Sequence, residues 1–312
     1  MPQAMPSPHA ANTPILASWG DTSPIEAELF VRSCAPGTTL LSGTISGPYC
    51  EGIQTLPADL RLQLCERAGE QVLTAIVPDP CFWAPDRPYL YRADVQVATG
   101  EEKEIKSESL LLGIRSLAVQ RENIMCGGRR HVMRIIDLPQ NFESPHDQET
   151  LLETCRATGS ALLLREFRET LCERASQKGV FLVLQCQGQL MQEGGFPFTR
   201  LACWPAIGMV VFAKDLDPAE LQESTVDSLL RAVVIDARDT ESPPWAQVLF
   251  LDEALLLQDP SADRSVPRMV FCRIPSGTSP RDARRACDDL QRRTTEYPQM
   301  AGYIASASGA LY

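Results

Sequence analysis

The chain has 312 residues, of which 44% are hydrophobic, and its formal net charge is -11. This length suffices for one large domain or two of ordinary size, and the apolar content supports a packed core rather than wholesale disorder. The acidic balance argues against a nucleic-acid partner, and no apolar run approaches the ~20 residues of a membrane span.

Residues 1–13 are rich in Pro, Ala and Ser and lack an apolar core of signal-peptide length, so we expect a disordered lead-in. Residues 14–117 then alternate apolar and polar side chains in short runs that glycines separate. Such runs are typical of the strands of an immunoglobulin-like β-sandwich. The predicted strands are 25–31, 38–45, 60–64, 71–77, 89–97 and 104–112, with a hairpin turn at 99–101; residues 60–68 have a short helix as their alternative.

A proline- and aromatic-rich segment at 83–91 precedes the strand that ends at Val97. Proline cannot donate to a strand ladder, so Pro85 and Pro88 are expected in a connection or at a strand start. They would hold Trp83 and Tyr89 against the edge of the sandwich. A packed aromatic corner without a ligand is the simplest interpretation of this segment.

The same segment resembles the central immunoglobulin-like domain of glycoside hydrolase family 2, the family of β-galactosidases, β-glucuronidases and β-mannosidases. That family closes the domain with a Gly-Phe-Arg strand, an Asn-Gly turn and a Leu-Arg-Gly strand that enters a TIM barrel. This chain has 113–115 as Gly-Ile-Arg, Gly127 at the turn, and Met133-Arg134 in place of Leu-Arg. Cys126 stands where the family has asparagine, and we expect no part of these 312 residues to form the family's jelly-roll domain.

Residues 118–312 alternate apolar strand candidates with helical stretches, a pattern that predicts a parallel sheet. Eight strand candidates favour a small (β/α)8 barrel, with a doubly wound open sheet as the alternative. The fold class is therefore multidomain, all-β followed by α/β. The strands are predicted at 131–137, 160–166, 180–186, 208–214, 232–236, 247–251, 268–274 and 300–305, and the helices at 148–158, 167–178, 218–231 and 280–293, with caps at Asp217, Ser279, Gly159 and Gly179.

In a TIM barrel the chemistry lies at the carboxyl ends of the strands. Binding residues are therefore expected among the polar side chains that end the strands here. These are Arg165, Glu166, Lys214, Asp236, Arg238, Asp252 and Glu253. Salt bridges around the barrel mouth are the structural alternative for these groups.

The resemblance also implies where two catalytic glutamates should stand. Its acid/base, after the fourth strand, falls on Lys214-Asp215, so Asp215 is a weak remnant on a shorter arm. Its nucleophile, after the seventh strand, falls on Cys272 or Arg273. No acidic residue lies between Pro267 and Pro280, so a small change of register does not restore it.

The function that follows is a family 2-like pseudoenzyme, a non-catalytic scaffold with a carbohydrate or protein partner. An active glycosidase that uses relocated carboxylates, or Cys186 or Cys272 as nucleophile, is the alternative. The 11 cysteines are dispersed and form no CxxC pair, which is typical of reduced core thiols in a cytoplasmic protein. None of the 3 histidines pairs with a cysteine at ligand spacing, so we expect neither a metal nor another cofactor.

Overall fold

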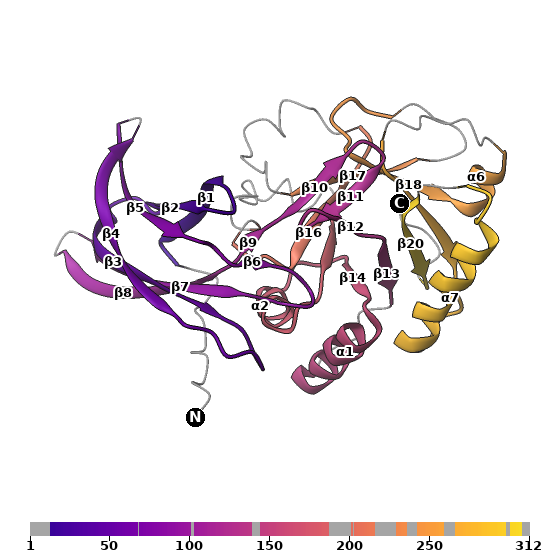
Figure 1. The fold of residues 1–312 in the computed structure, drawn as a ribbon, viewed down its shortest axis with the longest axis horizontal. Helices are drawn as coiled ribbons and strands as arrows, with labels where there is room; N and C mark the ends of the chain where they lie inside the picture. The colour runs from indigo at the N-terminus through magenta and orange to yellow at the C-terminus, as the bar shows by residue number, and fades with distance from the viewer. Residues whose placement is uncertain are drawn as a thin grey trace. The chain divides into compact units, whose positions relative to one another are not determined.

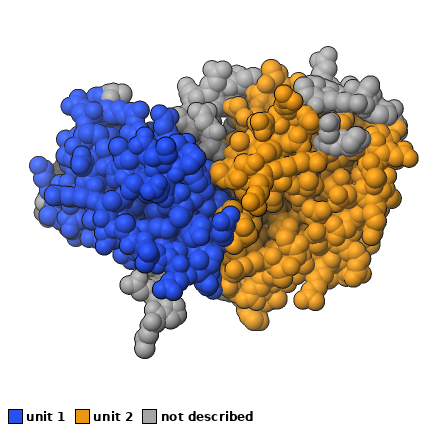
Figure 2. Space-filling view, viewed as in Figure 1, with its two compact units in different colours: residues 1–83, 87–115, 199–205 blue, residues 84–86, 116–198, 206–312 orange. Residues whose placement is uncertain are grey.

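A computed structural model describes residues 13–67, 69–100, 103–138, 144–186, 201, 203–215, 229–235, 242–258, 266–297 and 300–307. The chain divides into two compact units (Figure 2). The first comprises residues 1–83, 87–115 and 199–205, and the second comprises 84–86, 116–198 and 206–312. Each unit has its own sheet and its own buried core.

The first unit is a curled antiparallel sheet of seven strands in the order β1-β2-β5-β4-β3-β7-β8 (Figure 1). β4 belongs to both faces, because 58–62 pair with β3 and 63–67 pair with β5. This sharing converts one continuous sheet into two faces around an apolar core. The strands are β1 Ile15–Thr22, β2 Glu26–Ser33, β3 Thr39–Tyr49, β4 Ala58–Arg67, β5 Glu70–Pro78, β7 Leu90–Thr99 and β8 Glu104–Leu112.

This sheet confirms the predicted immunoglobulin-like sandwich and rejects the helix considered for 60–68. Buried and more exposed side chains alternate along these strands, as a half-buried sheet requires. In β2, Ala27, Leu29 and Val31 are buried while their neighbours are more exposed. β1 was not predicted, since its sequence begins with three consecutive apolar residues and then turns polar. The expected hairpin joins β7 to β8, with Thr99 opposite Glu104.

Both ends of the proline- and aromatic-rich segment belong to the sandwich, whereas residues 84–86 belong to the second unit. β6 Phe82–Trp83 pairs in parallel with β9 Ile114–Arg115, and Trp83 is only 1% exposed. The hydroxyl of Tyr91, at the start of β7, accepts a hydrogen bond from the backbone N–H of Cys81 at 2.8 Å. A tyrosine that bonds back to upstream backbone at this place is a feature of immunoglobulin sandwiches.

The second unit is a closed barrel of eight parallel strands, which confirms the barrel and excludes the open sheet. The ring closes where β13 pairs with β20. Almost every strand residue is buried, as expected where helices cover the outside of a parallel sheet. The strands are β13 Met133–Asp137, β14 Ala161–Leu164, β15 Leu182–Gln185, β16 Ile207–Phe212, β17 Leu230–Ile235, β18 Val248–Asp252, β19 Arg268–Arg273 and β20 Met300–Ser306; a small sheet of β10 Leu117–Gln120, β11 Asn123–Cys126 and β12 Arg129–Arg130 precedes them.

The helices of this unit are α1 Pro145–Thr158, α2 Glu169–Lys178, α6 Glu253–Gln258 and α7 Pro280–Arg293. The Ser279 hydroxyl caps α7 by accepting from the Asp282 N–H, and left-handed Gly159 and Gly179 end α1 and α2, as predicted. α6 was missed because six residues are too few to show a helical period. The helix predicted at 218–231 is wrong at its end, where Leu230 and Arg231 begin β17; Asp217 and 218–228 lie outside the described residues.

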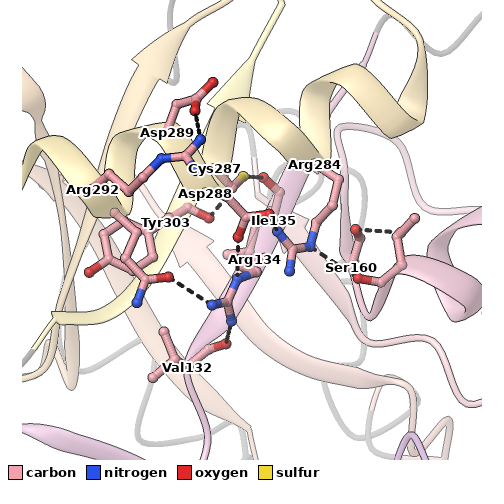
Figure 3. A network of polar contacts seen from close by, with 12 residues as sticks. Val132, Arg134, Ile135, Ser160, Arg284, Cys287, Asp288, Asp289, Arg292 and Tyr303 are labelled. Atoms are coloured by element: carbon pink, nitrogen blue, oxygen red, sulfur yellow. Dashed lines mark hydrogen bonds and ion pairs between the residues drawn. The ribbon is translucent and has the colours of Figure 1, made fainter.

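A polar network attaches α7 to the outside of β13 (Figure 3). Arg134 donates to Asp288 at 3.1 Å and to Gln291 at 2.7 Å, and Arg284 also pairs with Asp288. Burial acts to raise the pKa of Asp288, but the two guanidinium groups outweigh it and lower that pKa. Arg134 therefore faces the helix layer, which fixes the orientation of every other residue along β13.

Candidate functional site

The carboxyl ends of the barrel strands form one rim, where TIM barrels carry their chemistry. Because Arg134 faces outward, alternation turns Asp137, at the end of β13, toward the barrel interior. Asp137 is level with Ser306 of β20, and Ser306 is level with Arg273 of β19. These three residues therefore share the inner face of the rim.

Asp137 is the centre of a buried network at this rim. Its side chain is fully buried, and Arg165, which follows β14, donates to both carboxylate oxygens at 3.3 and 2.7 Å. The Ser306 hydroxyl donates to Asp137 Oδ2 at 2.6 Å, and the Ala307 N–H donates to the Asp137 carbonyl at 2.9 Å. The carboxylate thus joins the ends of β13, β14 and β20, and it satisfies the Arg165 charge inside the barrel.

Glu166 does not contribute to this network. Its exposed carboxylate accepts from Arg168 at 3.1 Å, two residues along the chain. Arg165 and Glu166 therefore face different surroundings, although the sequence predicted both as binding residues. Only Arg165 reaches the inside of the rim.

The acid/base position implied by the resemblance lies beyond β16, which ends at Phe212. Lys214 is partly buried, and Asp215 is exposed. The ring of Phe212 packs edge-on against Trp245 at 5.9 Å, so the end of this strand is held in place by aromatic packing. Asp215 thus stands past the ordered strand rather than on it.

The nucleophile position lies at the end of β19, where Cys272 and Arg273 face opposite sides. Cys272 contacts Arg293 of α7 in the helix layer, and burial raises the pKa of its thiol although Arg293 opposes that effect. Burial likewise raises the pKa of the Cys186 thiol to about 12. Both thiols therefore remain protonated at neutral pH, which disfavours the cysteine nucleophile considered from the sequence.

Arg273 is the neighbour of Cys272 on the inner side of the rim. Its side chain is exposed, and the described part of the chain supplies no ion-pair partner for it. A guanidinium cannot act as a carboxylate nucleophile, but it is a good donor to carboxylate or hydroxyl groups of a ligand.

The acidic pair after β18 is split in the same way. Asp252 is level with Phe271 of β19, and Phe271 is level with Ile304 of β20. Side chains at one level face the same way, so Asp252 belongs to the inner face of the barrel. Its Oδ1 accepts from the Ala254 N–H at 2.8 Å and thereby caps α6. Glu253 binds Arg293 with both oxygens, at 2.6 and 2.8 Å, on the outside of the barrel.

Asp236 and Arg238 lie outside the described residues.

Within the residues that are described, no cluster of three or more His, Cys, Asp or Glu side chains is arranged to hold a metal ion. None of the described helices has both the length and the apolar character that a membrane crossing requires.

Sequence reasoning missed Asp137, the buried carboxylate that accepts from both Arg165 and Ser306 at the rim. The signal was available, because an aspartate ends Met133–Asp137, the first barrel strand. Its partnership with Ser306 was not visible, since the two residues are 169 positions apart in the chain.

Comparison with known proteins gives a result for fold only. No protein-family model matches the chain, and no curated protein matches it. Among solved structures, β-glucuronidase 2 of Bacteroides uniformis matches 93% of this chain with a TM-score of 0.61 at 14% identity. A glycosyl hydrolase family 2 member from Bacteroides cellulosilyticus matches 94% with a TM-score of 0.60 at 13% identity.

The chain has the fold of the family 2 glycoside hydrolases. A third structure, the β-galacturonidase of Eisenbergiella tayi bound to galacturonate, agrees with a TM-score of 0.58 at 14% identity over 94% of this chain. The chain spans 45%, 43% and 64% of these three proteins. The sandwich and barrel described here therefore match only part of these longer proteins.

Proposed function

We propose that this chain is a family 2-like pseudoenzyme, a non-catalytic scaffold that binds a carbohydrate or a protein at the barrel rim. The end of β19 is the main support for this proposal. There the resemblance calls for a carboxylate nucleophile, whereas Cys272 faces the helix layer and exposed Arg273 faces inward.

A retaining glycosidase needs two carboxyl groups roughly 5–5.5 Å apart, one as nucleophile and one as acid/base. At the acid/base position, Asp215 is exposed and lies beyond the last residue of β16. Proton transfer to a leaving group requires a side chain that is held in one geometry against the substrate. Asp215 is exposed, and among the described residues none is seen to hold it in one geometry.

The rim retains groups that suit binding. Arg273 offers donors, and Asp252 and Asp215 offer acceptors, at the ends of β19, β18 and β16. The related folds carry the names β-glucuronidase and β-galacturonidase, which makes a sugar the first partner to examine. Charged donors and acceptors at the barrel rim also suit a protein loop, so both partner classes follow from the same groups.

Turnover is tested with aryl β-galactosides, β-glucuronides, β-galacturonides and β-mannosides on the purified chain. We expect aryl alcohol release no faster than from the Asp215→Asn/Asp252→Asn double variant. Release that Asp215→Asn alone abolishes would overturn the pseudoenzyme proposal.

Binding is tested separately by a glycan array followed by calorimetry. Sugar binding that Arg273→Ala weakens, and that Ile105→Ala on the exposed face of β8 leaves unchanged, supports a carbohydrate partner. If no glycan binds, the protein-partner form of the proposal remains, and cross-linking at rim position 273 in a cell lysate tests it against cross-linking at position 105. Equal products from both positions would count against a rim interface.

An active hydrolase with relocated carboxylates is favoured by one observation, the inward register of Asp252. In that case Asp252→Asn should abolish turnover while Glu253→Gln does not, because Glu253 is bound to Arg293 outside the barrel. The two substitutions remove one charge each from adjacent residues, so they form a matched pair.

A further inference from the structure

The sandwich unit contains a pocket that the barrel rim does not explain. It has a volume of about 430 Å³ and lies among β3, β4, β5, the start of β7 and the 50–57 connection. Small-molecule sites have volumes of roughly 300–1,000 Å³, with mostly apolar walls and a few placed polar groups. Its walls fit that description: Ile45, Pro48, Leu56, Ala58, Leu60, Val77, Pro78 and Tyr89 are the main lining residues.

Tyr91 provides the placed polar group. Its side chain lines the pocket, although the residue is only 2% exposed. The hydroxyl accepts from the Cys81 N–H at 2.8 Å, and Cys81 lines the same pocket. A phenol can also donate one hydrogen bond, and nothing in the described chain accepts the Tyr91 proton. A buried donor without an acceptor costs free energy that a ligand acceptor would recover.

Three further features define the ligand. Asp79 is the sole charged residue among the described residues that line the pocket, which disfavours anions. Leu56, which also lines the sandwich pocket, is 90% exposed, so the apolar body of a ligand would remove its side chain from water. Burial raises the pKa of Tyr91 to about 12, so the phenol keeps the proton that it would donate.

We propose that this pocket binds a small, uncharged, amphipathic molecule whose single hydrogen-bond acceptor takes the proton of the Tyr91 hydroxyl. The apolar body of the ligand lies between the prolines and tyrosines of the walls and covers Leu56. The site belongs to the sandwich alone and does not depend on the function proposed for the rim.

The probes are acetophenone and α-methylstyrene, which have nearly the same shape but differ in a carbonyl oxygen against a methylene group. Their dissociation constants are measured on the full chain by saturation-transfer NMR. Tyr91→Phe should weaken acetophenone about two- to tenfold, as expected for one lost hydrogen bond, and leave α-methylstyrene unchanged. Equal weakening of both probes, or of neither, would overturn the assignment of Tyr91.

A second variant keeps the test decisive if Tyr91→Phe does not fold, since that change also removes the acceptor of the Cys81 N–H. Ala58→Phe adds a ring at an exposed lining position and should reduce the binding of both probes. Ile105→Phe, an exposed position on β8 outside the pocket, is the matched control and should change neither. Unchanged binding to Ala58→Phe would place the probes elsewhere and refute the proposal. So would binding of methyl β-glucoside at this pocket with no binding of acetophenone.

Discussion

The polar residues that end the barrel strands are buried and paired on one side of the rim and exposed on the other. Around β13, β14 and β20, buried Asp137 binds Arg165 and Ser306, and each charge has a partner inside the protein. Around β16 and β19, Asp215 and Arg273 are exposed. We call these the closed side and the open side. Charges on the closed side hold strands together, whereas those on the open side remain available to a ligand.

The largest effect that would separate the two sides comes from Asp137→Ala. This substitution removes the fully buried carboxylate that pairs with Arg165, while the Arg165 charge stays in place. Removal of one partner of a buried pair typically costs about 3–5 kcal/mol of unfolding free energy. Urea unfolding followed by circular dichroism measures it, with Arg273→Ala on the open side as the control, expected to change stability by less than about 0.5 kcal/mol. Similar losses from both variants would remove the distinction.

Replacement of both Asp137 and Arg165 tests why the closed side depends on this pair. Asp137→Leu combined with Arg165→Leu removes both charges, and buried pairs replaced by apolar residues are often neutral or stabilising. We expect the double variant to recover most of the loss caused by Asp137→Leu alone. A double variant no more stable than the single one would mean that the network, and not the unpaired charge, sets the cost. The same urea curves give the answer.

Ser306→Ala tests the third member of the closed side. Ser306 is 2% exposed and donates to the carboxylate at 2.6 Å. Hydrogen bonds to charged groups contribute about 1.5–3 kcal/mol, so we expect a loss of that size. Ser276→Ala, at an exposed position after β19, should have almost no effect. A negligible loss at Ser306 would show that another donor replaces the hydroxyl.

The smallest effect concerns the helix layer beside the open side. Glu253→Gln weakens a bidentate pair with Arg293, whose side chain is 51% exposed. Partly exposed pairs contribute about 0.2–1 kcal/mol, and salt screens them. The difference from wild type should therefore shrink between low and 1 M salt, where the Debye length is about 3 Å. A difference that is insensitive to salt would indicate lost packing instead.

Sequence reasoning was accurate where local rules act alone. Pro280, Ser279 and the arginine-rich run predicted α7 from its first to its last residue, and alternation predicted most sandwich strands. It was least informative for the rim. Arg165 and Glu166 were placed in one group, yet one pairs with buried Asp137 and the other with Arg168 at the surface.

The amino-acid sequence by itself determined the two kinds of unit, because the period of its apolar residues distinguishes half-buried sandwich strands from fully buried barrel strands. It also determined that no acidic residue lies between Pro267 and Pro280, the stretch of sequence that contains β19. Only the tertiary structure decided which strand-end side chains meet. Parallel register brings Asp137 level with Ser306, which is 169 residues away, and turns Cys272 outward and Arg273 inward. Such pairings depend on ring closure and on which face each strand presents, and no local pattern encodes them.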